Sequence, residues 1–132
     1  MTRIFYSHAK KLYGRPEEAS QLSTIKNNFA LDATVVDPGA GDGVPDEENK
    51  EIEYFLRVID QCDCLVFSRY RGVVTSGVLR EVNYALSKGK AVYELRSGGR
   101  IIPIKKGFAR SSKIDALRFV LSESLRDALR GK

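Results

Sequence analysis

The sequence is poor in residues that hold metal ions or cross-link a chain. Its 132 residues include one histidine, two cysteines and no tryptophan. A structural zinc site takes about four nitrogen or sulfur ligands, so we expect no bound metal and no other cofactor. The cysteines, Cys62 and Cys64, lie in the segment CDC. This spacing is poor for a disulfide, and we expect two buried, reduced thiols.

Long hydrophobic runs are also absent. No apolar stretch approaches the roughly 18 residues that a membrane-spanning helix needs. The opening segment MTRIFYSHAKK lacks the central apolar block of a signal peptide. Because 42% of the residues are hydrophobic, the chain has enough apolar surface for one core. We therefore expect residues 1–132 to form a single cytoplasmic domain with no membrane partner.

Positive charge exceeds negative charge, and the formal net charge is +5. The basic residues are nevertheless scattered along the chain, which argues against a nucleic-acid partner. An anionic small molecule needs only two or three well-placed cations. The composition is therefore compatible with a nucleotide ligand.

Short apolar runs alternate with amphipathic segments along the chain, as in proteins whose helices connect the strands of a parallel sheet. The pattern predicts strands over 3–7, 33–37, 64–68, 91–95 and 101–104, the last at a sheet edge because it contains Pro103. It predicts helices over 16–29, 46–61, 78–88 and 113–129. The expected fold is a three-layer α/β domain, flavodoxin-like or Rossmann-like. Its sheet is doubly wound and mostly parallel, with about five strands.

Ligands in such folds bind beyond the carboxyl ends of the strands, which nominates the loops over 7–14, 37–43, 68–77 and 96–100. Tyr6, Ser7 and His8 end the first strand and begin its loop. Here an aromatic ring can stack on a base, and an imidazole can donate a proton. Structural explanations remain open, since Tyr6 can pack under a helix and a lone loop histidine is often only solvated.

The loop over 68–77 contains a predicted phosphate site. Arg69 and Arg71, together with Ser76, can hold a 5′-phosphate by charge-assisted hydrogen bonds, or can simply keep the loop solvated. Gly77 lets the backbone approach a ligand closely, and the amides at the start of the next helix favour an anion. Alternatively, Ser76 or Gly77 only caps that helix.

Glu81 occupies an unusual position in the segment TSGVLREVNYALSKGK. On a helical wheel it lies at the flank of the apolar stripe, where a leucine would be an easier choice. One explanation is that a carboxylate near a helix start is stabilised by the helix dipole. The other is that the helix presents Glu81 to a ligand.

The segment SGVLREVNYALSKGKAVYEL resembles the signature of the nucleoside 2-deoxyribosyltransferase-like family. The matching positions are Gly77, Glu81, Tyr84, Ala85, Gly89 and Lys90. RIFYSHAKK and QCDCLVFS are similar to the first and third strands of that family. The resemblance implies N-glycosidic bond cleavage or deoxyribosyl transfer on a nucleoside or nucleoside 5′-monophosphate, with Glu81 as nucleophile. It also implies a homodimer or higher homo-oligomer.

The sequence departs from the family at one important position. The family commonly has an aspartate eight residues before the Asp that opens its third strand, and counting back from Asp63 gives Phe55. Glu51 and Glu53 are close in sequence, but we expect them to face other directions on their helix. The acid that protonates the leaving base is therefore unassigned. The alternative function is a non-catalytic module that binds or senses a nucleotide in the same crevice.

Overall fold

The structure is a computed structural model that describes residues 2–29, 32–38 and 48–104. These residues contain five strands, which are β1 (Arg3–Ser7), β2 (Thr34–Val36), β3 (Cys64–Ser68), β4 (Ala91–Arg96) and β5 (Arg100–Pro103). The helices are α1 (Pro16–Asn28), α2 (Glu48–Asp60) and α3 (Ser76–Ser87), and the short 3₁₀ turn η1 covers Lys10–Leu12. The helix predicted over 113–129 lies outside the described residues.

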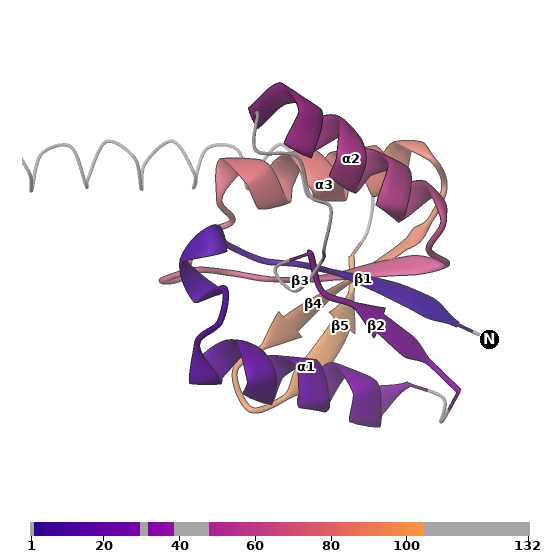
Figure 1. The fold of residues 1–132 in the computed structure, drawn as a ribbon. Helices are drawn as coiled ribbons and strands as arrows, with labels where there is room; N and C mark the ends of the chain where they lie inside the picture. Colours follow the sequence, from indigo (N-terminus) through magenta and orange to yellow (C-terminus); the bar gives the residue numbers. More distant parts are fainter. Residues whose placement is uncertain (1, 30–31, 39–47, 105–132) are drawn as a thin grey trace, which may run out of the picture.

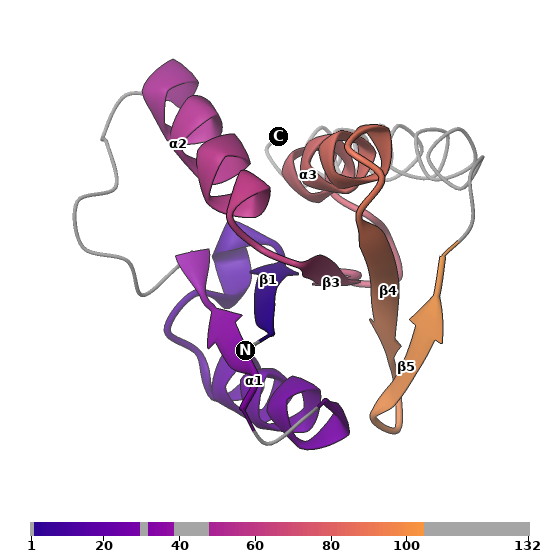
Figure 2. The same cartoon turned by 90° about the vertical axis from the view of Figure 1, so that its right-hand side faces the viewer.

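The strands form one sheet in the order β2-β1-β3-β4-β5. β1 pairs in parallel with β2 and β3, β3 pairs in parallel with β4, and β5 runs antiparallel to β4. α1 covers one face of the sheet, while α2 and α3 cover the other (Figures 1 and 2). This arrangement confirms the predicted three-layer α/β fold with a doubly wound, mostly parallel sheet.

Two apolar clusters fill the spaces between the sheet and its helices. Along β1, alternate side chains point to opposite faces of the sheet. Phe5 therefore packs with Val78 and Val82 of α3, whereas Ile4 packs with Ile25 of α1. Because both faces of the central strands are covered, all five residues of β3 are buried. This double burial accounts for the continuous apolar run in that part of the sequence.

The observed elements differ from the predicted ones mainly after β1 and at the start of α3. The turn η1 follows β1 directly and was not predicted. α3 begins at Ser76, two residues earlier than expected, and Thr75 is its N-cap. β5 lies at the sheet edge, as its proline predicted, and a turn containing Gly98 and Gly99 connects it to β4.

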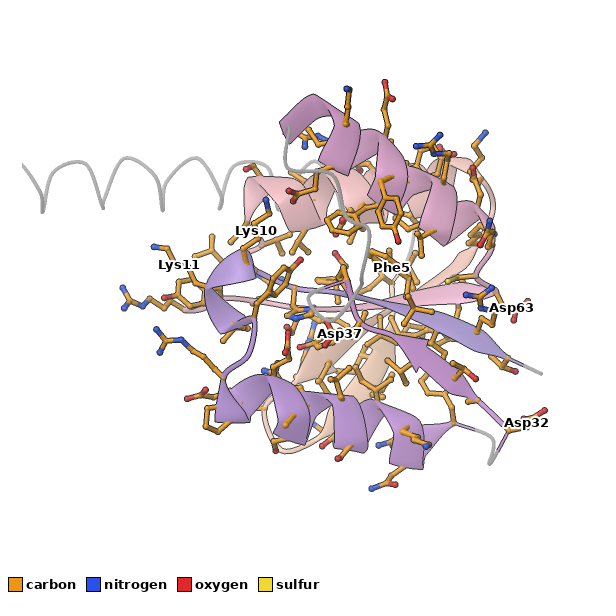
Figure 3. All side chains as sticks on the ribbon, in the orientation of Figure 1. Phe5, Lys10, Lys11, Asp32, Asp37 and Asp63 are labelled. Carbon is orange, nitrogen blue, oxygen red and sulfur yellow. The ribbon has the colours of Figure 1, made fainter. Side chains whose placement is uncertain are left out.

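The two ends of the sheet differ in the residues they carry. Figure 3 shows Lys10 and Lys11 at the end where β1 finishes, and Asp32 and Asp63 at the opposite end. In the described parts of the chain, none of the helices combines the length and apolar character needed to cross a bilayer. Phe5 and the other core residues lie between the two ends of the sheet. Ligand-binding loops of doubly wound folds gather at the carboxyl end, which here is the end with Lys10 and Lys11.

Candidate active site

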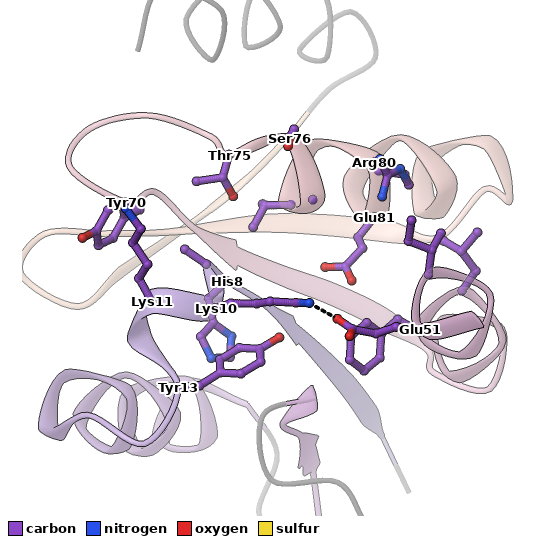
Figure 4. A pocket seen from close by; sticks show the side chains of 16 residues that line it. His8, Lys10, Lys11, Tyr13, Glu51, Tyr70, Thr75, Ser76, Arg80 and Glu81 are labelled. Carbon is purple, nitrogen blue, oxygen red and sulfur yellow. Dashed lines mark ion pairs between the residues drawn. The ribbon is translucent and has the colours of Figure 1, made fainter. Parts of the chain in front are cut away.

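A cavity of about 350 Å³ lies at the carboxyl end of the sheet. Its walls come from the loop after β1, from one face of α2, and from the loop after β3 with the first turns of α3. Figure 4 shows this cavity with Glu81 on one wall and Glu51 on another. The position beside β1 and β3 agrees with the rule that ligands of doubly wound folds bind where the strand order reverses.

The position of Glu81 follows from the packing of α3. Val78, Val82 and Ala85 are buried against the sheet, so the flank of the helix carries Glu81 to the rim of the core. There Ser7 donates a hydrogen bond from Oγ to Oε1 of Glu81 at 2.6 Å. The carboxylate points into the cavity (Figure 4). A contact between the end of β1 and α3 therefore holds Glu81 in place.

The environment of Glu81 makes its charged form unfavourable. Burial raises the pKa of Glu81 to about 7, although the hydrogen bond from Ser7 and the charge of Arg80 act in the opposite direction. Glu51 adds a repulsive contribution, and Lys10 an attractive one. Near neutral pH this carboxyl group is thus divided between its protonated and ionised forms. Perturbed carboxyl groups of this kind are common at functional sites.

Glu51 lies on α2 and lines the same cavity. The prediction that it faces away from the site was wrong. Phe55, one turn further along α2, packs against Phe5 with ring centroids 6.3 Å apart. Residues four apart share a helix face, so the packing of Phe55 also turns Glu51 inward. Glu53 is exposed, as expected.

Lys10 forms an ion pair with Glu51 and lies between the two carboxylates in Figure 4. The Lys10 side chain is 63% exposed, and the Glu51 side chain is 16% exposed. Tyr13, from the same loop, completes this wall. Burial, followed by the charges of Glu81 and Glu51, raises the pKa of Tyr13, so its hydroxyl stays protonated and can donate a hydrogen bond. This wall therefore presents an ammonium group and a hydroxyl group to the cavity.

A tight turn after β3 shapes the far end of the cavity. Tyr70 and Val73 exchange backbone hydrogen bonds of 2.8 and 3.1 Å, and the central residues Arg71 and Gly72 have φ values of 51° and 78°. Positive φ at both positions is typical of a type I′ turn. Tyr70 lines the cavity, with the ammonium group of Lys11 5.6 Å from its ring centroid. Lys11 and Tyr70 were not predicted, because the placement of Lys11 depends on η1 and that of Tyr70 depends on this turn.

The structure brings five of the predicted residues together. Glu81, His8, Ser76 and Gly77 line the cavity, and Ser7 contacts it through its hydrogen bond to Glu81. Thr75 caps α3 beside Ser76 and Gly77, so the first turn of this helix faces the cavity. The amides of a first helical turn are suited to an anionic or strongly polar ligand group.

Tyr6 lies elsewhere, as the structural explanation for it predicted. It is fully buried on the α1 side of the sheet, and its hydroxyl contacts Gln21 and lies 2.8 Å from Oγ of Ser68. Burial raises its pKa, so the hydroxyl remains protonated. Tyr6 reaches the cavity indirectly, because its ring stacks on His8 with centroids 4.1 Å apart.

The predicted phosphate site of Arg69, Arg71 and Ser76 is not formed in this conformation. Arg69 points toward β4, where its Nε donates to Glu94 Oε2 at 2.9 Å. Arg71 occupies the turn, with its guanidinium 5.3 Å from the ring centroid of Tyr70. The turn reverses the chain between Arg69 and Ser76. The three residues therefore do not meet at one point.

His8 belongs to a small polar cluster beside the cavity. Its Nδ1 lies 3.1 Å from the carbonyl oxygen of Tyr6, and its Nε2 lies 2.6 Å from Oε2 of Glu18. Asp37 is 3.8 Å from the same nitrogen. These three side chains offer one nitrogen and two carboxylate oxygens within 4.8 Å of one another, a set that could hold a divalent cation. The short contact with Glu18 already gives the imidazole a partner, so the geometry is explained without a metal.

Comparisons with known proteins support the fold and leave the activity open. No family model matches the chain, and no curated protein matches it. The structure is similar to the crystal structure of a conserved protein from Enterococcus faecalis V583, with a TM-score of 0.62 and 20% sequence identity. The match covers 89% of this chain and 75% of the other. At this level of identity, the similarity establishes a shared α/β fold.

Proposed function

We propose that this protein cleaves the N-glycosidic bond of a nucleoside or nucleoside 5′-monophosphate, by hydrolysis or by transfer of the deoxyribosyl group. The observation that carries the proposal is the carboxylate of Glu81, which is held by Ser7 and directed into a cavity at the carboxyl end of the sheet. The volume of about 350 Å³ is within the range of small-molecule sites. The resemblance around Gly77 and Glu81 supports the same reaction.

Glu81 acts as the nucleophile. Its carboxylate attacks C1′ of the sugar while the bond from C1′ to the base nitrogen breaks, and the electron pair of that bond leaves with the base. The same carboxylate stabilises the positive charge that develops on the sugar. Only the ionised form can attack. A pKa of about 7 thus keeps a useful fraction ionised, and the burial that raises this pKa also limits the solvation that would weaken the nucleophile.

Lys10 protonates the departing base. Its ammonium group is a proton donor, and its ion pair with Glu51 holds it near Glu81. It takes the role that the family gives to an acid at the position of Phe55, which is only 6% exposed and belongs to the core here. Water or a second base then releases the glycosyl group from Glu81. The proton lost by that incoming group returns to Lys10.

Different walls of the cavity contact different parts of the substrate. Tyr13 and Tyr70 provide aromatic surfaces for the planar base, while Ser76 and Gly77 at the start of α3 face the polar end of the substrate. A 5′-phosphate would meet this helix start and the ammonium group of Lys11. These contacts replace the arginines that the sequence suggested for that purpose.

The experiment that tests this proposal is a survey of base release. The protein is incubated with purine and pyrimidine ribonucleosides, deoxyribonucleosides and their 5′-monophosphates, each with and without a second free base. Free base is then measured chromatographically. We expect one subset to be cleaved, and Glu81→Gln to lower that rate by at least about 10³-fold while ligand-induced thermal stabilisation persists. Glu53→Gln, on the exposed side of α2, is the matched control.

A second candidate is a module that binds a nucleotide without turnover. The specific observation in its favour is Phe55, which places a buried ring where the family commonly has an acid. In that case the same survey gives no free base with the wild-type protein, but nucleotides still raise its melting temperature. Such a result would replace the enzymatic proposal.

We also propose that the protein acts as a cytoplasmic homo-oligomer. Cys62 and Cys64 are buried free thiols, and burial raises the pKa of Cys64 to about 11, which fits a reducing compartment. Oligomerisation rests on the family resemblance. Sedimentation at several concentrations tests it, and a monomer at every concentration would contradict it.

A further inference from the structure

A second cavity, of about 660 Å³, lies at the carboxyl ends of β3 and β4 beside α1. The charged residues on its wall are Arg69 after β3, Glu94 and Arg96 of β4, and Arg100 at the start of β5. It is therefore built from other residues than the cavity of Glu81. Its size is suited to a small molecule.

A buried carboxylate organises this wall. Glu94 is 2% exposed and accepts from Nε of Arg69 at 2.9 Å, while Nε of Arg96 lies 3.4 Å from its other oxygen. One carboxylate therefore fixes two guanidinium groups on the cavity wall. Formal charges on the four residues sum to two positive charges in excess, because three arginines face one glutamate. Such a wall favours an anion.

The hairpin between β4 and β5 concentrates this charge. Arg96 and Arg100 are directly opposite each other in the strand register. Like charges in this arrangement repel, which destabilises the hairpin. Gly98 and Gly99 have φ values of 83° and 77° and allow the tight connection that forces the two arginines together. An anion in the cavity would relieve this repulsion.

Neutral hydrogen-bonding groups complete the cavity. Ser20, Gln21 and Thr24 of α1 and Ser68 of β3 also line it. Guanidinium groups with neighbouring hydroxyls are a common means of binding phosphate oxygens, since each guanidinium can donate two parallel hydrogen bonds. The lining therefore combines polar residues of α1 with arginines at or beside β3, β4 and β5.

We propose that this second cavity binds a small molecule carrying a phosphate monoester. Its charge of about −1.5 to −2 at pH 7 matches the excess of two positive charges, whereas a monocarboxylate would neutralise only half of it. This site is independent of the proposed glycosidic activity, because none of its arginines lines the cavity of Glu81. It also gives Arg69 a role in anion binding, at a different place from the one the sequence suggested.

The test uses inorganic phosphate and ribose 5-phosphate as probes, titrated at constant ionic strength. Binding is followed by calorimetry and by backbone amide shifts of the ¹⁵N-labelled protein. We expect saturable binding, with the largest shifts at Gly98 and Gly99. The double variant Arg96→Gln, Arg100→Gln should weaken binding at least about tenfold. The control is Arg57→Gln, which removes the same type of charge from the exposed side of α2 and should leave the affinity within about twofold of wild type.

Each outcome decides the proposal. Tighter binding of ribose 5-phosphate than of inorganic phosphate identifies a phosphorylated metabolite as the ligand class, and equal binding identifies free phosphate. If the double variant binds as well as wild type, or if the shifts centre on Gly77, the cavity at Arg96 and Arg100 is not the site. Absence of saturation with both probes would also overturn the proposal. Amide spectra of the double variant show directly whether it is folded.

Discussion

Glu81 and Glu94 are both buried or nearly buried glutamates at the carboxyl end of the sheet, one in each cavity. Glu81 accepts a hydrogen bond from the neutral hydroxyl of Ser7, whereas Glu94 lies between the guanidinium groups of Arg69 and Arg96. A carboxylate buried without a directly bonded cation keeps an unfavourable charge and is available for reaction. A carboxylate bracketed by cations fixes their positions. The partners of a buried glutamate, more than its burial, thus determine whether it can react or only positions its neighbours.

After the loss expected for Glu81→Gln, the next largest effect should come from removing the proposed proton donor of the first cavity. Lys10→Gln should lower base release from unmodified purine nucleosides about 100-fold, because the departing base loses its acid. Release from N7-methylated purine nucleosides should stay within a few-fold of wild type, since a cationic base leaves without needing a proton. Initial rates with both substrates check this, with Lys26→Gln of α1 as control. Equal losses on both substrates would assign Lys10 to binding.

Removing the charge of Glu94 should destabilise the protein. Glu94→Gln leaves Arg69 and Arg96 without their shared anion, and their side chains are 28% and 45% exposed, so solvent compensates in part. We expect a loss of about 2 to 3 kcal/mol in unfolding free energy. Urea denaturation at pH 8 measures it. A loss below 0.5 kcal/mol would mean that the bracketing contacts contribute little.

The same substitution at Glu81 should have the opposite sign. The folded protein has a raised pKa of about 7 at this residue, so protons are bound more tightly in the folded than in the unfolded state. The unfolding free energy therefore falls as pH rises from about 4.5 to 7, and Glu81→Gln should remove this decline. We expect the variant to be more stable than wild type by about 1 to 2 kcal/mol at pH 8 and equal to it at pH 4. Parallel denaturation curves at both pH values test the sign.

The smallest effect concerns the hydroxyl beside Glu81. Ser7 lowers the pKa of Glu81 through its hydrogen bond, so Ser7→Ala should raise that pKa further. If Glu81 attacks as an anion, kcat/KM rises as the pH increases through 7, and the variant should need a higher pH to reach the same fraction of its plateau. Ser87→Ala, which removes an exposed hydroxyl on α3, provides the control profile. A wild-type profile that falls through pH 7 would instead make Glu81 a proton donor.

The fold was predictable because its signals are local. Apolar runs identified the strands, and the spacing of apolar residues identified the helices that cover them. Glu81 was found for the same reason, since its flank position on α3 can be read from a helical wheel. Glu51 could have been found similarly, because it lies one turn before Phe55 on α2, and an apolar residue of an amphipathic helix indicates its inner face.

The rest of the site depends on contacts between distant segments. Lys10 and Tyr13 reach the cavity through η1, a short turn with no strong sequence signal. Arg69 was assigned to the wrong cavity, since it lines the second cavity beside β4 whereas Ser76 lines the first. The partner that attracts Arg69 is Glu94, 25 residues later, and sequence spacing alone does not reveal such a pair.

The antiparallel pairing of β4 with β5 has a consequence for how the chain assembles. Arg96 and Arg100 close their hairpin across three residues, and hairpins of this kind form in about 1–10 μs. Ile4, by contrast, must find Cys64, so the parallel pairing of β1 with β3 requires closure of a long loop and the ordering of two helices on the way. The arginine hairpin can therefore form without the rest of the sheet, whereas Ser7 and Glu81, 74 residues apart, meet only when α3 has packed beside β1. During synthesis, β1 emerges first but can pair with β3 only after the intervening chain has followed it, whereas β5 can pair with β4 as soon as it emerges.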